Sequence, residues 1–375
     1  MPPGREGSGR ARRRWCRRAE RFARGGRAGL EPPIIGSLLR PGLIPVKRCA
    51  VAAHARRIFD RLVKSRPVNS KSPLPAEVRV IERGWLNCNQ IVLRAPGANV
   101  LVDSGYVSHQ DRTVALVEAA LEGEALARLV NTHCHSDHMG GNAAIARRYG
   151  ARITIPEGEV RHVVPWTPQS VWMERFDQRA EEFAFHDTIA AGDSFDAGGL
   201  DWQAIAAPGH DIDALMFFNA RHRILVSGDA LWENGMGFVW PEAGGHPHID
   251  AAMATLSAIA KLDPAVVIPG HGAPFTQVAK ALATAASRLK AFAEDPAKNA
   301  RHVAKALFIF SLLDKGHMAV AEVPAYLSRV AYFGELNEQF FHAPPESLGE
   351  WLLQDLMRSG AVAVEGGFLR ATAKA

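Results

Sequence analysis

The sequence has few cysteines and no long hydrophobic run. Its 375 residues contain only four cysteines, and their spacing matches no paired motif: Cys16, Cys49, Cys88 and Cys134. We therefore expect no disulfide framework and a cytoplasmic location. No apolar stretch approaches the ~20 residues of a membrane-spanning helix, so no membrane partner is expected. With 47% hydrophobic and 22% charged residues, the composition is that of a globular protein.

Positive charge is scarce outside the first part of the chain. Residues 1–64 hold 17 Lys or Arg against 4 Asp or Glu, whereas the whole chain holds 44 against 39. Residues 65–375 therefore carry 27 basic against 35 acidic side chains, a net charge of −8. A negative body does not suit a surface that follows nucleic-acid phosphates.

Residues 1–75 are predicted to be a basic, disordered extension and linker. Residues 10–27 are rich in Arg, Gly and Ala without a pattern of packing, and residues 65–76 are rich in Pro and Ser. The Arg run at 12–14 is not followed by the apolar segment of about 7 to 15 residues that a secretory signal needs. A targeting peptide, a nucleic-acid-binding arm and an extension absent from the mature protein are the alternatives.

Short apolar strands alternate with helical patterns from residue 78 to about 280. The expected strands include 90–93, 100–102, 129–130, 153–155, 202–206, 215–218, 224–226 and 266–268, and the expected helices 111–127, 142–149 and 251–262. Residues 195–200 are expected to form a turn. Several strands end just before a polar residue that neighbours Gly or Pro. This order predicts an α/β fold in layers, with polar side chains gathered at one edge.

Potential metal ligands are concentrated at a few of these strand ends. Residues 133–138 read His-Cys-His-Ser-Asp-His, which places three imidazoles and a carboxylate within six residues. His210, Asp229 and His271 follow at long range, and Asp103 precedes them all. Imidazole nitrogens and carboxylate oxygens are the ligands that a borderline divalent cation such as zinc prefers.

The spacing predicts that these groups bind two metal ions. The expected ligands are His133, His135 and His210 for one ion and Asp137, His138 and His271 for the other, with Asp229 bridging the pair. Asp103 is expected to orient an imidazole rather than to bind. Two ions about 3.5 to 4 Å apart hold a hydroxide between them and stabilise the attacked oxygen. We therefore predict a two-Zn²⁺ hydrolase, with Fe or Mn as alternative metals and with Asp137 and Asp229 as catalytic residues.

Asp103, residues 133–138, His210, Asp229 and His271 form five motifs. In this order they resemble the motifs of the metallo-β-lactamase superfamily, over roughly residues 78 to 285. The resemblance implies an αββα sandwich with the site at the sheet edges, and a hydrolase domain at residues 76–285. Asp229 is similar to the bridging acid of the thioesterase, lactonase and phosphodiesterase branches, whereas zinc β-lactamases commonly carry Cys or Ser there. We therefore predict a small-molecule thioester or lactone substrate. Persulfide dioxygenase activity remains an alternative, because those enzymes share much of the motif.

One motif departs from the family pattern. The resemblance leads us to expect His-Thr-x-Gly around the third motif, but residues 210–213 read His-Asp-Ile-Asp. The resemblance therefore does not predict the structure of the loop after His210 or the shape of the substrate pocket. Six aromatic residues between the ligand motifs could line an acyl pocket or pack in the core: Trp166, Trp172, Phe176, Trp232, Phe238 and Trp240.

Residues 286–375 are predicted to form a winged-helix-like domain. Helical patterns at 282–293, 303–314 and 348–357 precede a β-hairpin at 361–370. This order is similar to the subgroup that joins the hydrolase domain to a C-terminal winged helix, some members of which act on RNA. The alternative function is therefore an endoribonuclease or phosphodiesterase that uses the same metals and grips nucleic acid with this domain. The sequence predicts no particular oligomeric state.

Overall fold

The first of two large sheets is formed by the N-terminal part of the described chain. In this computed structural model, residues 74–373 are described, so nearly all of the predicted extension lies outside the described residues. The six strands run in the order β1-β2-β3-β4-β5-β6. They are β1 (Val78–Ile81), β2 (Gln90–Leu93), β3 (Asn99–Val102), β4 (Leu126–Val130), β5 (Arg152–Pro156) and β6 (Asp187–Ile189). The three pairs from β3 to β6 are parallel.

The second sheet follows in the chain and has the order β11-β10-β9-β8-β7. Its strands are β7 (Ser194–Ala197), β8 (Leu200–Ala206), β9 (Leu215–Asn219), β10 (Ile224–Gly228) and β11 (Val266–Pro269). Only β10 and β11 pair in parallel. The turn expected at 195–200 is shorter than predicted, because only Gly198 and Gly199, both with positive φ, separate β7 from β8.

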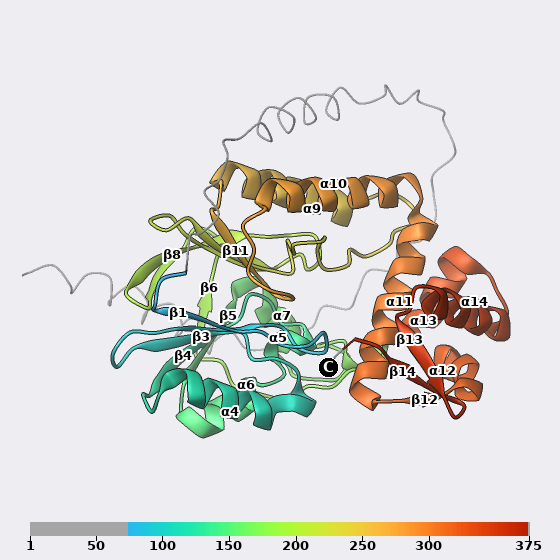
Figure 1. Cartoon of the computed structure of the whole chain (residues 1–375), viewed down its shortest axis with the longest axis horizontal. Coiled ribbons are helices and arrows are strands. Elements are labelled where there is room, and N and C mark those ends of the chain that lie inside the picture. Colours follow the sequence, from blue (N-terminus) through green and yellow to red (C-terminus); the bar gives the residue numbers. More distant parts are fainter. Residues whose placement is uncertain (1–73, 374–375) are drawn as a thin grey trace, which may run out of the picture. The chain divides into compact units, whose positions relative to one another are not determined.

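Hydrophobic side chains on both faces of each sheet produce four layers (Figure 1). The sheets face each other through residues such as Val102 and Phe217. Helices α4 (Gln110–Leu121) and α6 (Asn142–Tyr149) cover the outer face of the first sheet. Helices α9 (Pro247–Leu262) and α10 (Val278–Glu294) cover the second. The predicted αββα architecture is thus confirmed.

Short helical turns connect the strands of the first half. They are η1 (Val107–His109), α5 (Ser136–Met139), η2 (Glu157–Glu159), α7 (Val160–Val163) and α8 (Met173–Phe176). Of these, α5 carries the end of the predicted ligand loop.

The C-terminal region has its own hydrophobic core, which includes Phe308, Leu352 and Leu369. Its strands form a small sheet in the order β12-β14-β13, and the hairpin expected at 361–370 is present as β13 and β14. The elements are α11 (Pro296–Lys315), β12 (Met318–Ala319), η3 (Val320–Glu322), α12 (Val323–Arg329), α13 (Ala331–Leu336), η4 (Asn337–Phe341), α14 (Pro345–Arg358), β13 (Val362–Glu365) and β14 (Phe368–Ala371). The winged-helix assignment of this region stays a prediction.

The domain boundary predicted at residues 285 and 286 falls inside α10. This helix continues to Glu294, and its residues Leu289 and Phe292 belong to the core that covers the second sheet. A helix buried along one face on a single sheet belongs with that sheet. We therefore propose to place the boundary between α10 and α11, at Asp295.

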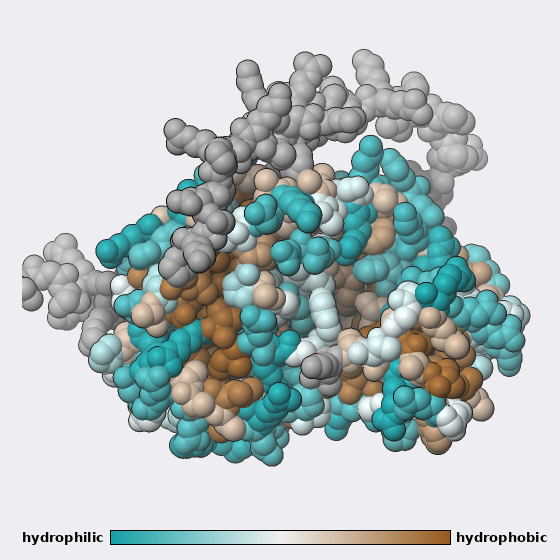
Figure 2. Space-filling view, in the orientation of Figure 1, coloured by the Kyte–Doolittle hydropathy of each residue, from teal (hydrophilic) through white to brown (hydrophobic). Residues whose placement is uncertain are grey.

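The surface in Figure 2 is mostly hydrophilic, with one hydrophobic patch left of centre over the strands and another at the lower right over the C-terminal elements. Exposed large hydrophobic residues of that region are Met357, Val364 and Phe368. Within residues 74–373, no helix is long and apolar enough to cross a membrane.

Candidate metal centre

All seven predicted ligands lie together at the ends of strands. His133 follows β4, His210 follows β8, Asp229 follows β10 and His271 follows β11. Their ligand atoms form two groups, and within each group these atoms lie within 4.8 Å of one another. The imidazole cluster consists of His133, His135 and His210, and the carboxylate cluster consists of Asp137, His138, Asp229 and His271. The sequence-based prediction divides these residues in the same way, except that it assigns Asp229 to both ions.

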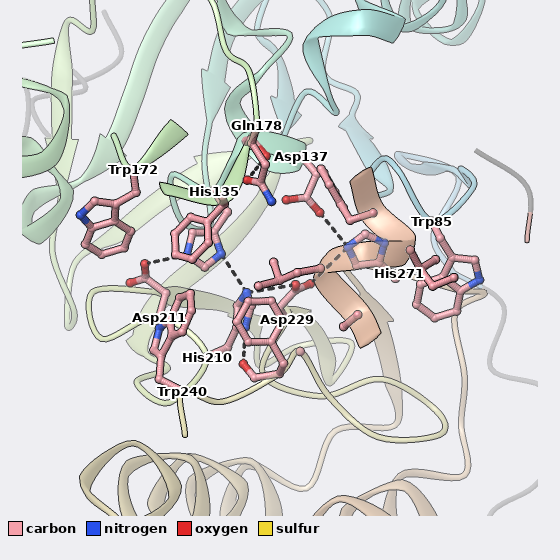
Figure 3. A pocket seen from close by; sticks show the side chains of 18 of the residues that line it. Trp85, His135, Asp137, Trp172, Gln178, His210, Asp211, Asp229, Trp240 and His271 are labelled. Carbon is pink, nitrogen blue, oxygen red and sulfur yellow. Dashed lines mark hydrogen bonds and ion pairs between the residues drawn. The ribbon is translucent and has the colours of Figure 1, made fainter. Parts of the chain in front are cut away.

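Asp229 lies between the two clusters (Figure 3). Its Oδ2 is 3.4 Å from Nε2 of His210, in the imidazole cluster. Its Oδ1 is 3.4 Å from Nε2 of His138 and 3.8 Å from Nε2 of His271, both in the carboxylate cluster. The indole Nε1–H of Trp232 also donates to Oδ1, at 3.2 Å. One carboxylate therefore faces both groups, as a bridging ligand must.

Hydrogen bonds on the far side of the rings orient the histidines. Nδ1 of His210 lies 2.6 Å from the carbonyl oxygen of Phe238. Because a carbonyl oxygen can only accept, Nδ1 carries the hydrogen and Nε2 presents its lone pair to the site. Nδ1 of His138 lies 2.9 Å from Oδ2 of Asp103 in the same manner.

Asp103 is held in place by the loop that follows β4. Its Oδ1 accepts the backbone N–H of Thr132 at 2.8 Å, and its Oδ2 accepts the Thr132 hydroxyl at 2.8 Å. It is buried and has a φ of 57°, a left-handed conformation that short polar residues tolerate better than most. Asp103 therefore contacts His138 from outside the carboxylate cluster, the location expected of an orienting residue.

Two buried nitrogens indicate that the donor set fits a cation. Nε2 of His133 and Nε2 of His138 have no hydrogen-bond partner among residues 74–373. Burying an unpaired polar atom is costly, so such atoms are rare without a function. A divalent ion accepted by these nitrogens and the neighbouring carboxylates would satisfy them.

The imidazole cluster is built to stay neutral. Burial, with the neighbouring His135, lowers the pKa of His210 to about 4. Burial likewise lowers the pKa of His135 to about 4, and it holds the pKa of His133 well below its usual value. Neutral imidazole is the form that binds a metal, so these rings are ready to act as ligands at pH 7.

Charges dominate the carboxylate cluster instead. Burial alone would lower the pKa of His138, but nearby Cys88 and the carboxylates of Asp137 and Asp229 raise it well above the usual value. Burial would raise the pKa of Asp229, but His271 and His138 outweigh it and hold this pKa well below the usual value. In the absence of a metal, protons therefore take the place of a cation among these acids.

Two glycines allow the ligands to approach one another. A Cβ atom at Gly270 would lie 2.3 Å from Oδ1 of Asp229, and one at Gly237 would lie 2.8 Å from Cγ of His210. Neither distance is possible for real atoms. The Gly before His271 is thus required by the packing of the site.

Five of the seven predicted ligands line a cavity of about 460 Å³: His135, Asp137, His210, Asp229 and His271. Five of the six aromatic residues singled out in the sequence line it: Trp172, Phe176, Trp232, Phe238 and Trp240. Trp166 instead packs on the outer side of the first sheet, beside Phe183. The opposite wall comes from α11, through Ile309, Phe310 and Leu313.

Sequence reasoning missed three residues of the site. Trp85 stacks on the ring of His271, with centroids 5.5 Å apart and planes at 6°. Asp211 Oδ2 lies 3.4 Å from Nε2 of His135, on the side away from His210. Gln178 lines the cavity above Asp137 (Figure 3). The unusual residue Asp211 in the third motif could have indicated its role in the site. No sequence pattern near Trp85 or Gln178 indicates that these residues belong to it.

Comparison with known proteins agrees with this geometry. The family model of the metallo-beta-lactamase superfamily matches residues 83–271, half of the chain. The chain therefore belongs to the metallo-beta-lactamase superfamily, and the predicted class, a hydrolase of this fold, is confirmed at that level.

Curated relatives match only part of the chain. A hydroxyacylglutathione hydrolase of Rhodopseudomonas palustris is 29% identical over 143 residues, which cover 38% of this chain and 48% of the relative. One from Brucella ovis is 27% identical over 158 residues, which cover 40% and 54%. The chain thus spans about half the length of the curated relatives that it matches.

Solved structures with a similar fold are more distant in sequence. A beta-lactamase domain protein from Burkholderia ambifaria has a TM-score of 0.47 and 18% identity, and the match covers 83% of this chain and 95% of that one. A metallo-beta-lactamase family protein from Thermus thermophilus has a TM-score of 0.47 and 20% identity, with 78% and 97% covered.

Proposed function

We propose that the protein is a dinuclear metal hydrolase that cleaves a small thioester. The observation that carries this proposal is the position of Asp229, whose two oxygens face different histidine clusters. The proposed ligands of the two ions, which we propose to be zinc, are the members of the imidazole and carboxylate clusters. When bound, such ions polarise a carbonyl group and lower the pKa of bound water to about 7.

The chain's own residues would orient the reaction and move its protons. Trp232 holds Oδ1 of Asp229, and Asp103 holds Nδ1 of His138, so both ligands are fixed before substrate arrives. Asp137 faces the cavity, with Oδ2 3.1 Å from Nε2 of His271. We propose that this oxygen receives the proton of the attacking water and passes it to the leaving sulfur.

The nature of the cavity favours a small apolar acyl group. Aromatic side chains line much of it, and α11 closes one side with Ile309 and Leu313. Pockets of this type bind compact, mostly apolar ligands oriented by a few polar groups. The hydroxyacylglutathione hydrolases among the relatives act, by their names, on glutathione thioesters, which supports a thioester over a lactone.

An RNA substrate fits this cavity less well. A single-stranded nucleic acid needs a basic channel that follows its backbone. The body of the chain, residues 65–375, is acidic, with 35 acidic against 27 basic side chains. We therefore propose a small-molecule substrate and keep the phosphodiesterase as the alternative to be tested. The cytoplasmic location expected from the sequence remains part of the proposal.

Metal analysis followed by a substrate panel tests the proposal. We expect about two equivalents of zinc per chain by elemental analysis. A panel of S-lactoylglutathione, an octanoyl thioester, a γ-lactone and an RNA oligonucleotide should show hydrolysis of the thioesters, abolished by EDTA and restored by zinc. The proposal is wrong if protein purified under metal-replete conditions contains no metal, or if the RNA is the only substrate that is cleaved.

A further inference from the structure

A second hollow adjoins the metal cavity at the junction of α10 and α11. This groove, of about 880 Å³, is bounded by α10, α11 and α14. Its basic lining residues are Lys280, Arg288, Lys298, Arg301 and Lys305, and the only acid among the described residues that line it is Asp355. We call it the basic groove. It gathers five basic side chains on a body whose net charge is negative.

The basic groove and the metal cavity share part of their lining. Arg288, His302 and Lys305 line both. Arg288 is held at this junction because its guanidinium donates to the backbone carbonyl of Asn234 at 3.0 Å. A Cβ at Gly235 would lie 2.3 Å from the same guanidinium, so the 232–237 loop and Arg288 are closely packed. A molecule that spans both hollows would pass these three shared side chains.

The charges of the groove are only partly neutralised. Lys305 pairs with Asp355, and Arg301 pairs with Asp295 at 3.3 Å. Lys280 and Lys298 are exposed and form no ion pair within residues 74–373. Unpaired cations that converge on one groove attract an anion with several charges, and phosphate is the group that Lys and Arg bind most readily.

We propose that the basic groove binds the phosphates of a nucleotide-bearing thiol, so that the substrate is an acyl thioester of coenzyme A type. This inference rests on the proposed thioester hydrolysis. The apolar acyl chain would occupy the aromatic cavity, and the phosphates would lie among Lys280, Lys298 and Arg301. In the reaction, water adds its oxygen to the carbonyl carbon, the C–S bond breaks, and the released thiolate takes up a proton, so that one acid and one thiol leave.

Binding of the thiol product tests the groove without turnover. We expect the unaltered full chain to bind coenzyme A about tenfold or more tightly than pantetheine, which has the same thiol but no phosphate. The double variant Lys280→Ala/Lys298→Ala should lose most of this preference. Lys290→Ala is the matched control, because Lys290 is an exposed residue of α10 that pairs with Glu294 and does not line the groove. Equal affinities for the two thiols overturn the inference.

Kinetics with two thioesters separate this inference from the proposed function. The kcat/KM for octanoyl-coenzyme A should fall about tenfold in the double variant, while that for octanoyl-N-acetylcysteamine, which lacks phosphate, stays unchanged. If both thioesters are hydrolysed equally by every variant, thioester hydrolysis stands and the phosphate site is wrong. If neither is hydrolysed but coenzyme A is bound in preference to pantetheine, the phosphate site stands and the proposed function fails. Tighter binding of an RNA oligonucleotide than of coenzyme A, weakened by the same double variant, would overturn the inference in favour of nucleic acid.

Discussion

The imidazole cluster and the carboxylate cluster manage charge in opposite ways. Burial lowers the pKa of His135 and His210 to about 4, so the first cluster offers neutral donors. The second holds two acids, and the charges around His138 raise its pKa well above the usual value. A cation on the first cluster would keep its full charge, whereas one on the second would be largely neutralised. If each cluster binds an ion, as we propose, this difference in charge predicts two sites of different strength, with Asp229 facing both.

Removal of Asp229 should have the largest effect, because it breaks the connection between the clusters. In Asp229→Ala we expect kcat to fall by about 10³-fold and one of the two metal equivalents to be lost. Steady-state kinetics with elemental analysis measures both. Asp201→Ala, an exposed position on β8, serves as the control. A full metal content with an unchanged rate in Asp229→Ala would contradict the bridging role.

A methyl group at Gly270 should disturb the carboxylate cluster by packing alone. In Gly270→Ala the new Cβ would collide with Asp229 Oδ1, so we expect about 10²-fold lower activity and weaker metal binding. Gly334→Ala is the matched control, because Gly334 is an exposed residue of α13 and nothing lies within 4 Å of its added Cβ. That variant should keep its activity and gain slight stability. Equal activity of the two variants would refute the crowding argument.

Substitution of the two outer acids should weaken the two clusters separately. Asp103→Ala removes the partner of His138 at 2.9 Å, and we expect metal affinity in the carboxylate cluster to fall by about 10- to 100-fold. Asp211→Ala acts on His135 across a longer 3.4 Å contact and should cost the imidazole cluster less. Competition with a chelator in each variant gives the two affinities. The reverse order of effects would show that the outer contacts do not control the clusters.

The smallest expected effect is on the pH dependence of the metal-free protein. The pKa of His135 is about 4 in the folded state and 6.5 in the reference state, so the unfolded chain binds the extra proton first. The stability from this neutral ring is therefore complete above about pH 6.5 and is lost as the pH falls toward about 4. Urea unfolding at about pH 7 and about pH 4.5 should show a smaller loss in His135→Gln than in the unaltered protein. An identical loss in both would indicate that His135 does not titrate as described.

The layers of the fold were accessible from sequence, because strand and helix periodicities are local. Helix α6 has the predicted limits, and β10 and β11 end at Gly228 and Pro269, where Asp229 and His271 were expected. The boundary inside α10 was not accessible, because burial of Leu289 on the second sheet depends on tertiary packing. The contact of Trp85 with His271 also joins residues far apart in the chain, and no local pattern indicates it.

The candidate site residues can be proposed from the sequence for a chemical reason. Histidines and acids next to strand ends are uncommon without a role, so their order carried the prediction. The shape of the cavity was not predictable in the same way, because its far wall comes from α11, outside the predicted hydrolase domain. The basic groove was not predictable from the charges in the sequence either, because Lys280 and Lys298 come together only where α10 and α11 meet in the fold.

Helix α11 belongs to two hydrophobic environments at once. Phe308 and Leu312 pack in the C-terminal core, whereas Ile309 and Leu313 line the substrate cavity. A substitution in that core would shift the far wall of the cavity, because the two sets of side chains lie on one helix. If the proposed function holds, changes in the packing of the C-terminal core would alter which acyl groups fit, while the sequence of the ligand motifs stays the same.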